Sequence, residues 1–73
     1  MKTLKDIPAG QTAKVLKVNA RGSMRKRIMD MGLTRGCTVE VRKVAPLGDP
    51  IEVCLRGYEL SIRKSEAETI DVE

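Results

Sequence analysis

The sequence predicts a mainly β fold, a small five-stranded barrel with one short α-helix between the first and second strands. Two observations carry this prediction: a chain of 73 residues has room for only one core, and its apolar residues alternate in short segments separated by glycine and proline. A flat sheet of this size would leave its apolar face and its edges open, so we expect a strongly bent sheet. Residues 1–73 should therefore form a single domain.

The first strand is expected at residues 12–18, "TAKVLKV". Ala13 and Val15 lie on one side of it, and Leu16 breaks the alternation before Val18. An interruption of this kind is typical of a β-bulge.

A short helix should follow, because Met24, Ile28 and Met31 recur at spacings of four and three residues and form one apolar stripe. Ser23 is expected to cap its start with its hydroxyl group. Gly32 should end the helix, since glycine adopts the left-handed conformation of a helix C-cap without steric cost. We expect this helix to cover an open end of the sheet.

After the helix, Leu33 should close the cap by an apolar contact, and residues 34–36 should turn the chain into the next strand. A loop with proline at both ends is expected at residues 45–50, and a single helical turn at residues 64–67. The remaining strands are expected at residues 37–44, 51–55, 58–62 and 69–72. Ile51, Val53, Leu55, Tyr58, Leu60, Ile62, Ile70 and Val72 form their apolar sides.

Enzyme chemistry is not expected. The sequence contains no P-loop, no dinucleotide-binding glycine motif and no histidine that could activate a serine or cysteine. Cys37 and Cys54 fall on opposite faces of their strands, so they should neither form a disulfide nor share a metal ion. We therefore predict no catalytic residues, no metal site and no cofactor.

The basic residues of the helix region raise the question of a binding surface. Arg21, Arg25, Lys26, Arg27 and Arg35 cluster there, whereas the acidic residues fall mostly on the later strands. Such a cluster can attract phosphate or an acidic protein surface, and it can equally be a solvated face. The two interpretations stay open at this point.

Apolar residues outside the predicted core are further contact candidates. Met29 lies off the apolar stripe of the helix, so we expect it to be more exposed than Met24 and Met31. Leu47 is a large apolar residue at the tip of the loop at residues 45–50, where polar residues are usual. Docking and chance exposure are equally compatible with its position.

The formal charge of +4 and the pI near 9.4 favour an acidic partner. Nucleic acid is the alternative, but the single tyrosine and the absence of Phe and Trp leave nothing on which bases could stack. The longest apolar runs are too short to cross a membrane, and the N-terminal residues do not resemble a signal peptide. A cytoplasmic location is expected.

"RIMDMGLTRGCTVEV" together with "APLGDPIEVCLRGYELSIRKSEAETIDV" resembles the FeoA family, over nearly the whole chain. The most specific residues are Met31-Gly32-Leu33 with Gly36, the loop from Pro46 to Pro50, and Gly57 with Arg63 and Glu66-Ala67. The resemblance implies an SH3-like barrel and a non-enzymatic accessory protein of ferrous iron uptake. The same barrel occurs as a protein-contact domain in metal-dependent repressors of the diphtheria-toxin-repressor type, so fold alone does not decide the function.

The partner implied by this resemblance is the cytoplasmic side of the membrane transporter FeoB, which would hold the protein at the membrane indirectly. We expect Arg25, Arg27, Met29, Leu33 and Leu47 to contact it. No binding of nucleic acid is expected, and pairing of copies into a homo-oligomer stays open because exposed barrel edges can pair.

Overall fold

The computed structural model describes residues 2–73. Its elements follow one another in the order η1 (Leu4–Asp6), β1 (Thr12–Val18), α1 (Gly22–Asp30), β2 (Thr38–Val44), β3 (Ile51–Leu55), β4 (Tyr58–Ile62), α2 (Lys64–Ala67) and β5 (Ile70–Val72), where η1 is a 3₁₀ turn. The five predicted strands and the helix between the first two are confirmed. The strands expected at residues 37–44 and 69–72 each begin one residue later than predicted.

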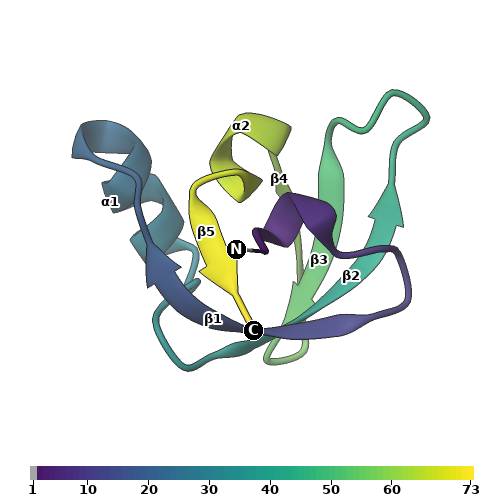
Figure 1. The fold of residues 1–73 in the computed structure, drawn as a ribbon, viewed down its shortest axis with the longest axis horizontal. Coiled ribbons are helices and arrows are strands. Elements are labelled where there is room, and N and C mark those ends of the chain that lie inside the picture. The colour runs from purple at the N-terminus through teal and green to yellow at the C-terminus, as the bar shows by residue number, and fades with distance from the viewer. Residues whose placement is uncertain (1) are drawn as a thin grey trace.

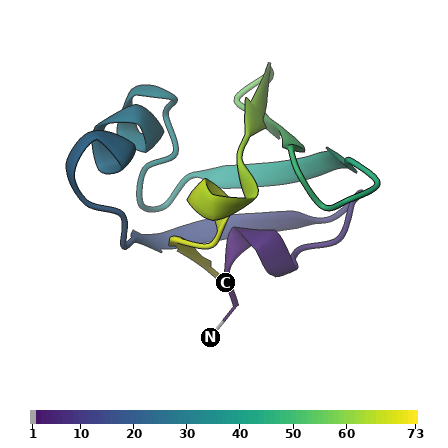
Figure 2. The same ribbon diagram turned by 90° about the horizontal axis from the view of Figure 1, so that it is seen from above.

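All strands belong to one antiparallel sheet with the order β4-β3-β2-β1-β5. The sheet bends strongly around a common core, and α2 connects its two edge strands, β4 and β5 (Figures 1 and 2). Helix α1 lies at one end of the bent sheet and the loop between β2 and β3 lies at the other end. This is the small bent barrel that the alternating pattern predicts.

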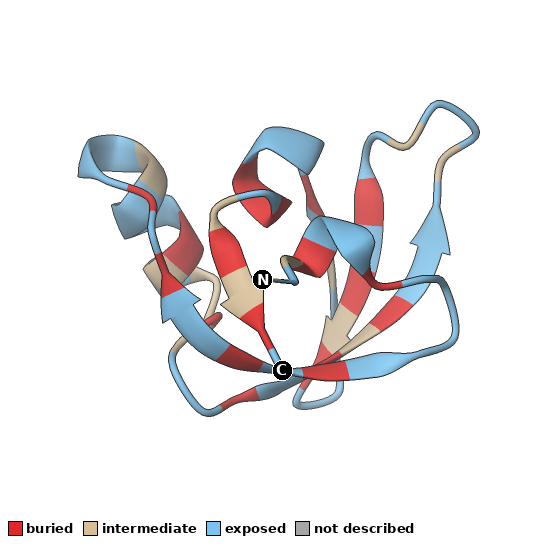
Figure 3. Cartoon of the chain, in the orientation of Figure 1, coloured by how far each residue is buried: buried red, intermediate tan, exposed pale blue. Residues whose placement is uncertain are grey.

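The core consists of the inward side chains of every strand, one residue of α1, and buried residues of η1, α2 and the connecting loops (Figure 3). The largest completely buried side chains are Leu4, Ile28, Leu33, Ile62, Ile70, Val15, Val39, Val41 and Val53. The alternation of buried and exposed residues is clearest in β3, with the pattern predicted from sequence. It follows from the pleat of a strand, which sends successive side chains to opposite faces.

The β3–β4 hairpin is closed by Arg56 and Gly57, which both have positive φ, of 51° and 83°. Two positive φ angles give the twist that suits a two-residue hairpin turn. Tyr58 stands opposite Leu55 on the core side, as predicted, yet it is 72% exposed. The hairpin end of the edge strand β4 extends past the core, so Tyr58 lies on the predicted side of the strand but is largely exposed.

The start of α1 differs from the prediction. The helix begins at Gly22, which has a φ of 62°, and Arg21 precedes it in an extended conformation. Ser23 therefore lies inside the first turn, and no side-chain hydrogen bond caps the helix. The predicted cap by Ser23 is wrong because the chain enters the helix before reaching it.

The N-terminal turn η1 was not predicted from the sequence, and it holds the two ends of the described chain together. Leu4 of η1 is completely buried. The Val72 amide donates to the Lys2 carbonyl at 3.0 Å, and Thr3 forms an isolated β-bridge with Asp71. Residues 2–7 thus cover the core beside β5.

Candidate partner-binding site

A bulge in β1 shapes the surface beside α1. The register of β1 against β5 shifts between Val15 and Lys17, which confirms the bulge predicted at Leu16. In a regular strand Lys17 would follow Val15 toward the core. With the extra residue, Leu16 and Lys17 both face solvent and Val18 returns to the core. The bulge therefore places an apolar and a basic side chain together on the outer surface.

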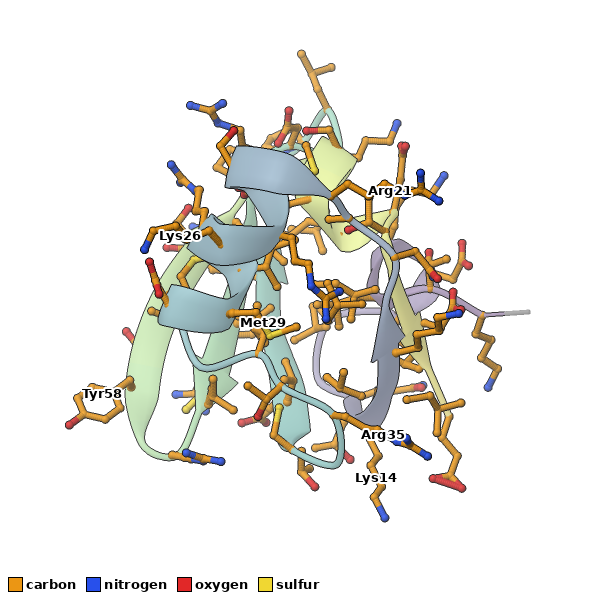
Figure 4. The ribbon with its side chains drawn as sticks, turned by 90° about the vertical axis from the view of Figure 1, so that its left-hand side faces the viewer. Lys14, Arg21, Lys26, Met29, Arg35 and Tyr58 are labelled. Atoms are coloured by element: carbon orange, nitrogen blue, oxygen red, sulfur yellow. The ribbon has the colours of Figure 1, made fainter. Side chains whose placement is uncertain are left out.

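These two residues form one wall of a shallow groove between β1 and α1. The groove is lined by Leu16, Lys17, Val18, Arg25, Met29 and Arg35. Its cations are spread around it and its apolar atoms come from Leu16, Val18 and Met29. Figure 4 views the side of the molecule on which Met29 and Arg35 lie. We call this feature the β1–α1 groove.

Arg25 fixes the geometry of the β1–α1 groove. Its Nη1 donates a hydrogen bond of 2.8 Å to the carbonyl oxygen of Val18, the last residue of β1. This bond ties α1 to the strand and satisfies a carbonyl at the strand end. The remaining guanidinium N–H groups can still bind an anion, since arginine has five donors.

Met29 also lies in this groove, but it is only half-buried and packs against the core, as do Met24 and Met31. All three methionines are thus partly buried, and whether Met29 is the most exposed of them stays a prediction. Ile28 is the one residue of α1 that is completely buried, and the methionines spread around it.

Arg27 does not line the groove and pairs instead with Glu66 of α2. Its Nε lies 2.7 Å from Oε2 of Glu66 in α2, a side chain that is only 3% exposed. The other oxygen of Glu66 accepts the Arg63 amide at 2.8 Å and so caps the start of α2. Arg27 therefore holds α1 against α2, and a contact between Arg27 and a partner stays a prediction.

The end of α1 is a Schellman motif. The Gly32 amide donates to the Met29 carbonyl at 2.9 Å, the Leu33 amide donates to the Ile28 carbonyl at 3.3 Å, and Gly32 has a φ of 93°. This confirms Gly32 as the residue that ends the helix and Leu33 as the residue that closes the cap. Leu33 is 0% exposed, however, so the prediction that it contacts a partner is wrong.

Leu47 is 92% exposed at the tip of the β2–β3 loop. The loop is held by the Gly48 amide, which donates to the Ala45 carbonyl at 2.7 Å, and by Oδ1 of Asp49, which accepts the Lys64 amide of α2 at 2.9 Å. The loop lies at the end of the molecule opposite α1 (Figures 1 and 2). Leu47 and the β1–α1 groove are therefore two separate surfaces.

The structure thus brings together Arg25 and Met29 but separates them from Arg27, Leu33 and Leu47. Leu16 and Lys17 belong to the groove and were not predicted as contact residues. The broken alternation at Leu16 was the available signal, because a bulge re-aims the side chains beside it.

The cysteines and carboxylates form no recognisable centre in the described part of the chain. Cys37 is buried, Cys54 is half-buried, and both are free thiols. Within residues 2–73 no three His, Cys, Asp or Glu side chains gather in a way that could hold a metal ion. None of the helices described is long and apolar enough to span a membrane.

Two shifted pKa values lie outside the groove. The Thr3 backbone amide donates to the Asp6 carboxylate at 2.9 Å and lowers the pKa of Asp6 below its usual value of 3.8. The hydrogen bond from Arg42 to Glu40, 3.1 Å long, raises the pKa of Arg42.

Comparison with known proteins gives a consistent family. The sequence model of the FeoA domain matches residues 2–73. A curated relative, the Fe(2+) transport protein A/Fe(2+) transporter FeoB fusion protein of Porphyromonas gingivalis, is 39% identical over 70 residues, which are 96% of this chain and 8% of that protein. The chain therefore spans a small part of this relative's length.

Solved structures agree with this assignment. The FeoA protein of Chlorobium tepidum is 46% identical, with a TM-score of 0.90 over 99% of this chain and 69% of that one. The zinc complex of Stenotrophomonas maltophilia FeoA, described as a prokaryotic SH3 domain protein, is 26% identical, with a TM-score of 0.87 over 100% of this chain and 91% of that one. The predicted SH3-like fold is confirmed, and the chain belongs to the FeoA family, which is associated with ferrous iron transport.

Proposed function

We propose that this protein is a non-enzymatic accessory domain that binds the cytoplasmic part of a FeoB-type ferrous iron transporter and regulates it. The observation that carries the proposal is the relative in which a segment 39% identical to this chain shares one polypeptide with FeoB. Fusion keeps two domains at a high effective concentration, which is useful where they bind each other.

The β1–α1 groove is a suitable surface for such a contact. It combines an apolar floor with three cations, Lys17, Arg25 and Arg35. An apolar centre supplies most of the binding free energy in protein interfaces, while charges around it steer association. The formal charge of +4 has the sign that attracts an acidic partner surface or the anionic face of a membrane.

The direct test is a titration of this protein against the cytoplasmic GTPase domain of the FeoB-type transporter from the same organism. Binding is measured by isothermal titration calorimetry. The titration is run with and without guanine nucleotide, at low and at physiological salt. We expect saturable binding that depends on the nucleotide and weakens as the salt concentration rises. This is the behaviour of a regulator that binds one nucleotide-dependent conformation of the GTPase domain. Absence of binding under all four conditions would contradict the proposal.

Nucleic acid is the competing partner because of the clustered arginines. The same titration with single-stranded RNA and duplex DNA distinguishes the two functions, since phosphate binding falls steeply between low and physiological salt. We expect no binding of either nucleic acid at low salt.

A further inference from the structure

The charged residues that line the β1–α1 groove are all basic. None of its six lining residues is acidic, and Lys14 and Arg21 add positive charge on the same side of the molecule (Figure 4). By contrast, the depression beside Arg42 on the other face contains two glutamates, Glu52 and Glu59. The β1–α1 groove is thus the more selective of the two for an anion.

The carboxylates nearest in the fold are already engaged. Asp30 of α1 pairs with Lys26 at 3.3 Å. Asp71 stands opposite Lys17 in the β1–β5 ladder, and its Oδ2 accepts the side-chain amide of Asn19 at 2.9 Å. Among residues 2–73, no carboxylate oxygen lies within 4.0 Å of the charged groups of Lys17 or Arg35. These two cations are therefore available to a ligand.

The apolar residues that line the groove favour a ligand that also carries an apolar group. Leu16 is 39% exposed and Met29 is half-buried on the core, so both keep apolar surface open to solvent. Methionine adapts its shape to different apolar partners at low cost. A ligand that fills the groove should then offer one large apolar side chain between acidic groups.

A protein segment fits this combination better than nucleic acid or lipid. The only tyrosine, Tyr58, points away from the groove, so no aromatic ring is available there for stacking a base (Figure 4). Insertion into a membrane needs apolar side chains that protrude, whereas Val18 is buried and Met29 is half-buried where they line the groove. A peptide can place alternating acidic and apolar side chains at these positions.

We infer that the β1–α1 groove binds a short acidic segment of the partner, with one large apolar side chain between its carboxylates. The apolar side chain packs on Leu16 and Met29, and the carboxylates pair with Lys17 and Arg35. This inference rests on the proposed function, since it takes the transporter as the protein that carries the segment.

The test compares two double variants of equal charge. Lys17→Gln with Arg35→Gln removes two of the three cations of the groove, and Lys2→Gln with Lys43→Gln removes two exposed lysines elsewhere. Both lower the formal charge from +4 to +2, so general steering changes equally. In titrations of the FeoB cytoplasmic domain at low salt, we expect the groove variant to lose about tenfold in affinity and the control to lose less than about threefold.

A third variant, Leu16→Gln, tests the apolar lining of the groove without changing the charge. We expect it to weaken binding by about threefold to tenfold, with the same salt dependence as the unaltered protein. Because Leu16 is partly exposed, its urea midpoint should stay close to that of the unaltered protein. Urea midpoints of all variants show that a loss of binding does not come from unfolding.

The outcomes separate the inference from the proposed function. If the unaltered protein binds and both double variants bind equally well, the groove is not the site, the inference is wrong and the proposed function stands. If the unaltered protein does not bind, the proposed function is wrong and the inference falls with it. Tighter binding to single-stranded RNA, or to vesicles of phosphatidylglycerol and phosphatidylcholine in equal parts, would overturn the acidic segment in favour of that ligand.

Discussion

Replacement of Arg27 by methionine should destabilise the fold far more than a similar change one residue away. Arg27 Nε lies 2.7 Å from the carboxylate of Glu66, whose side chain is 3% exposed, while the Arg27 side chain itself is 51% exposed. Breaking a completely buried pair costs about 3–5 kcal/mol, and a hydrogen bond to a charged group contributes about 1.5–3 kcal/mol. Because water reaches Arg27, we expect a cost near the lower end of the range for a hydrogen bond to a charged group, about 1.5 kcal/mol.

Thermal and urea unfolding followed by circular dichroism measure this cost. In a domain of this size, a loss of about 1.5 kcal/mol lowers Tm by roughly 6–12 °C. The matched control is Lys26→Met in the same helix, whose 3.3 Å pair with Asp30 has side chains that are 77% and 67% exposed. We expect the control to change the free energy of unfolding by less than about 0.5 kcal/mol.

A double-mutant cycle decides whether the ion pair itself is responsible. Glu66→Gln keeps the shape and leaves an oxygen for the Arg63 amide, so it removes chiefly the charge. We expect the effects of Arg27→Met and Glu66→Gln to be coupled by about 1 kcal/mol. Equal destabilisation by Arg27→Met and Lys26→Met, or additivity in the cycle, would refute the reasoning.

Three further changes test other features. In Gly32→Ala, the alanine must adopt a positive φ of 93°, and its Cβ lies 3.3 Å from a core side chain, so the free energy of unfolding in urea should fall by about 1–3 kcal/mol. Gly48→Ala is the control: its φ is 82°, but no atom lies near the added Cβ, so the loss should be smaller. Asp6→Asn should lower the urea midpoint at neutral pH. A lowered pKa stabilises the fold above the unfolded value near 3.8, and this stabilisation is lost as pH falls through the lower folded value, so the difference should shrink as the solution is acidified below 3.8; a difference that does not change with pH would exclude the charge as its cause. Leu47→Asp should leave the urea midpoint unchanged, since Leu47 is 92% exposed, and weaken binding to the FeoB domain severalfold; unchanged affinity would remove this loop from the interface.

The strands were predictable because each has one face in the core. Ile51, Val53 and Leu55 are 2%, 0% and 3% exposed, and their alternation is visible directly in the sequence. Parity does not show where the core ends, however. Tyr58 has the correct parity but lies beyond the edge of the core, and only the three-dimensional extent of the sheet decides that.

The site was less predictable because its geometry depends on contacts between distant segments. Arg25 and Arg27 look alike in the sequence, yet one binds the carbonyl of Val18 and the other binds Glu66. No periodicity distinguishes these two partners. Leu33 was similarly ambiguous, because an apolar residue after a helix can face either solvent or the core, and here it closes a Schellman motif from inside.

Helix α2 has only four residues, yet it contacts structural elements at both ends of the barrel. At one end Glu66 holds α1 through Arg27, and at the other the Lys64 amide holds the β2–β3 loop through Asp49. These two bonds form a continuous connection from α1 through α2 to the loop that carries Leu47. One helix of four residues thus links the groove side of the molecule to the far side of the domain.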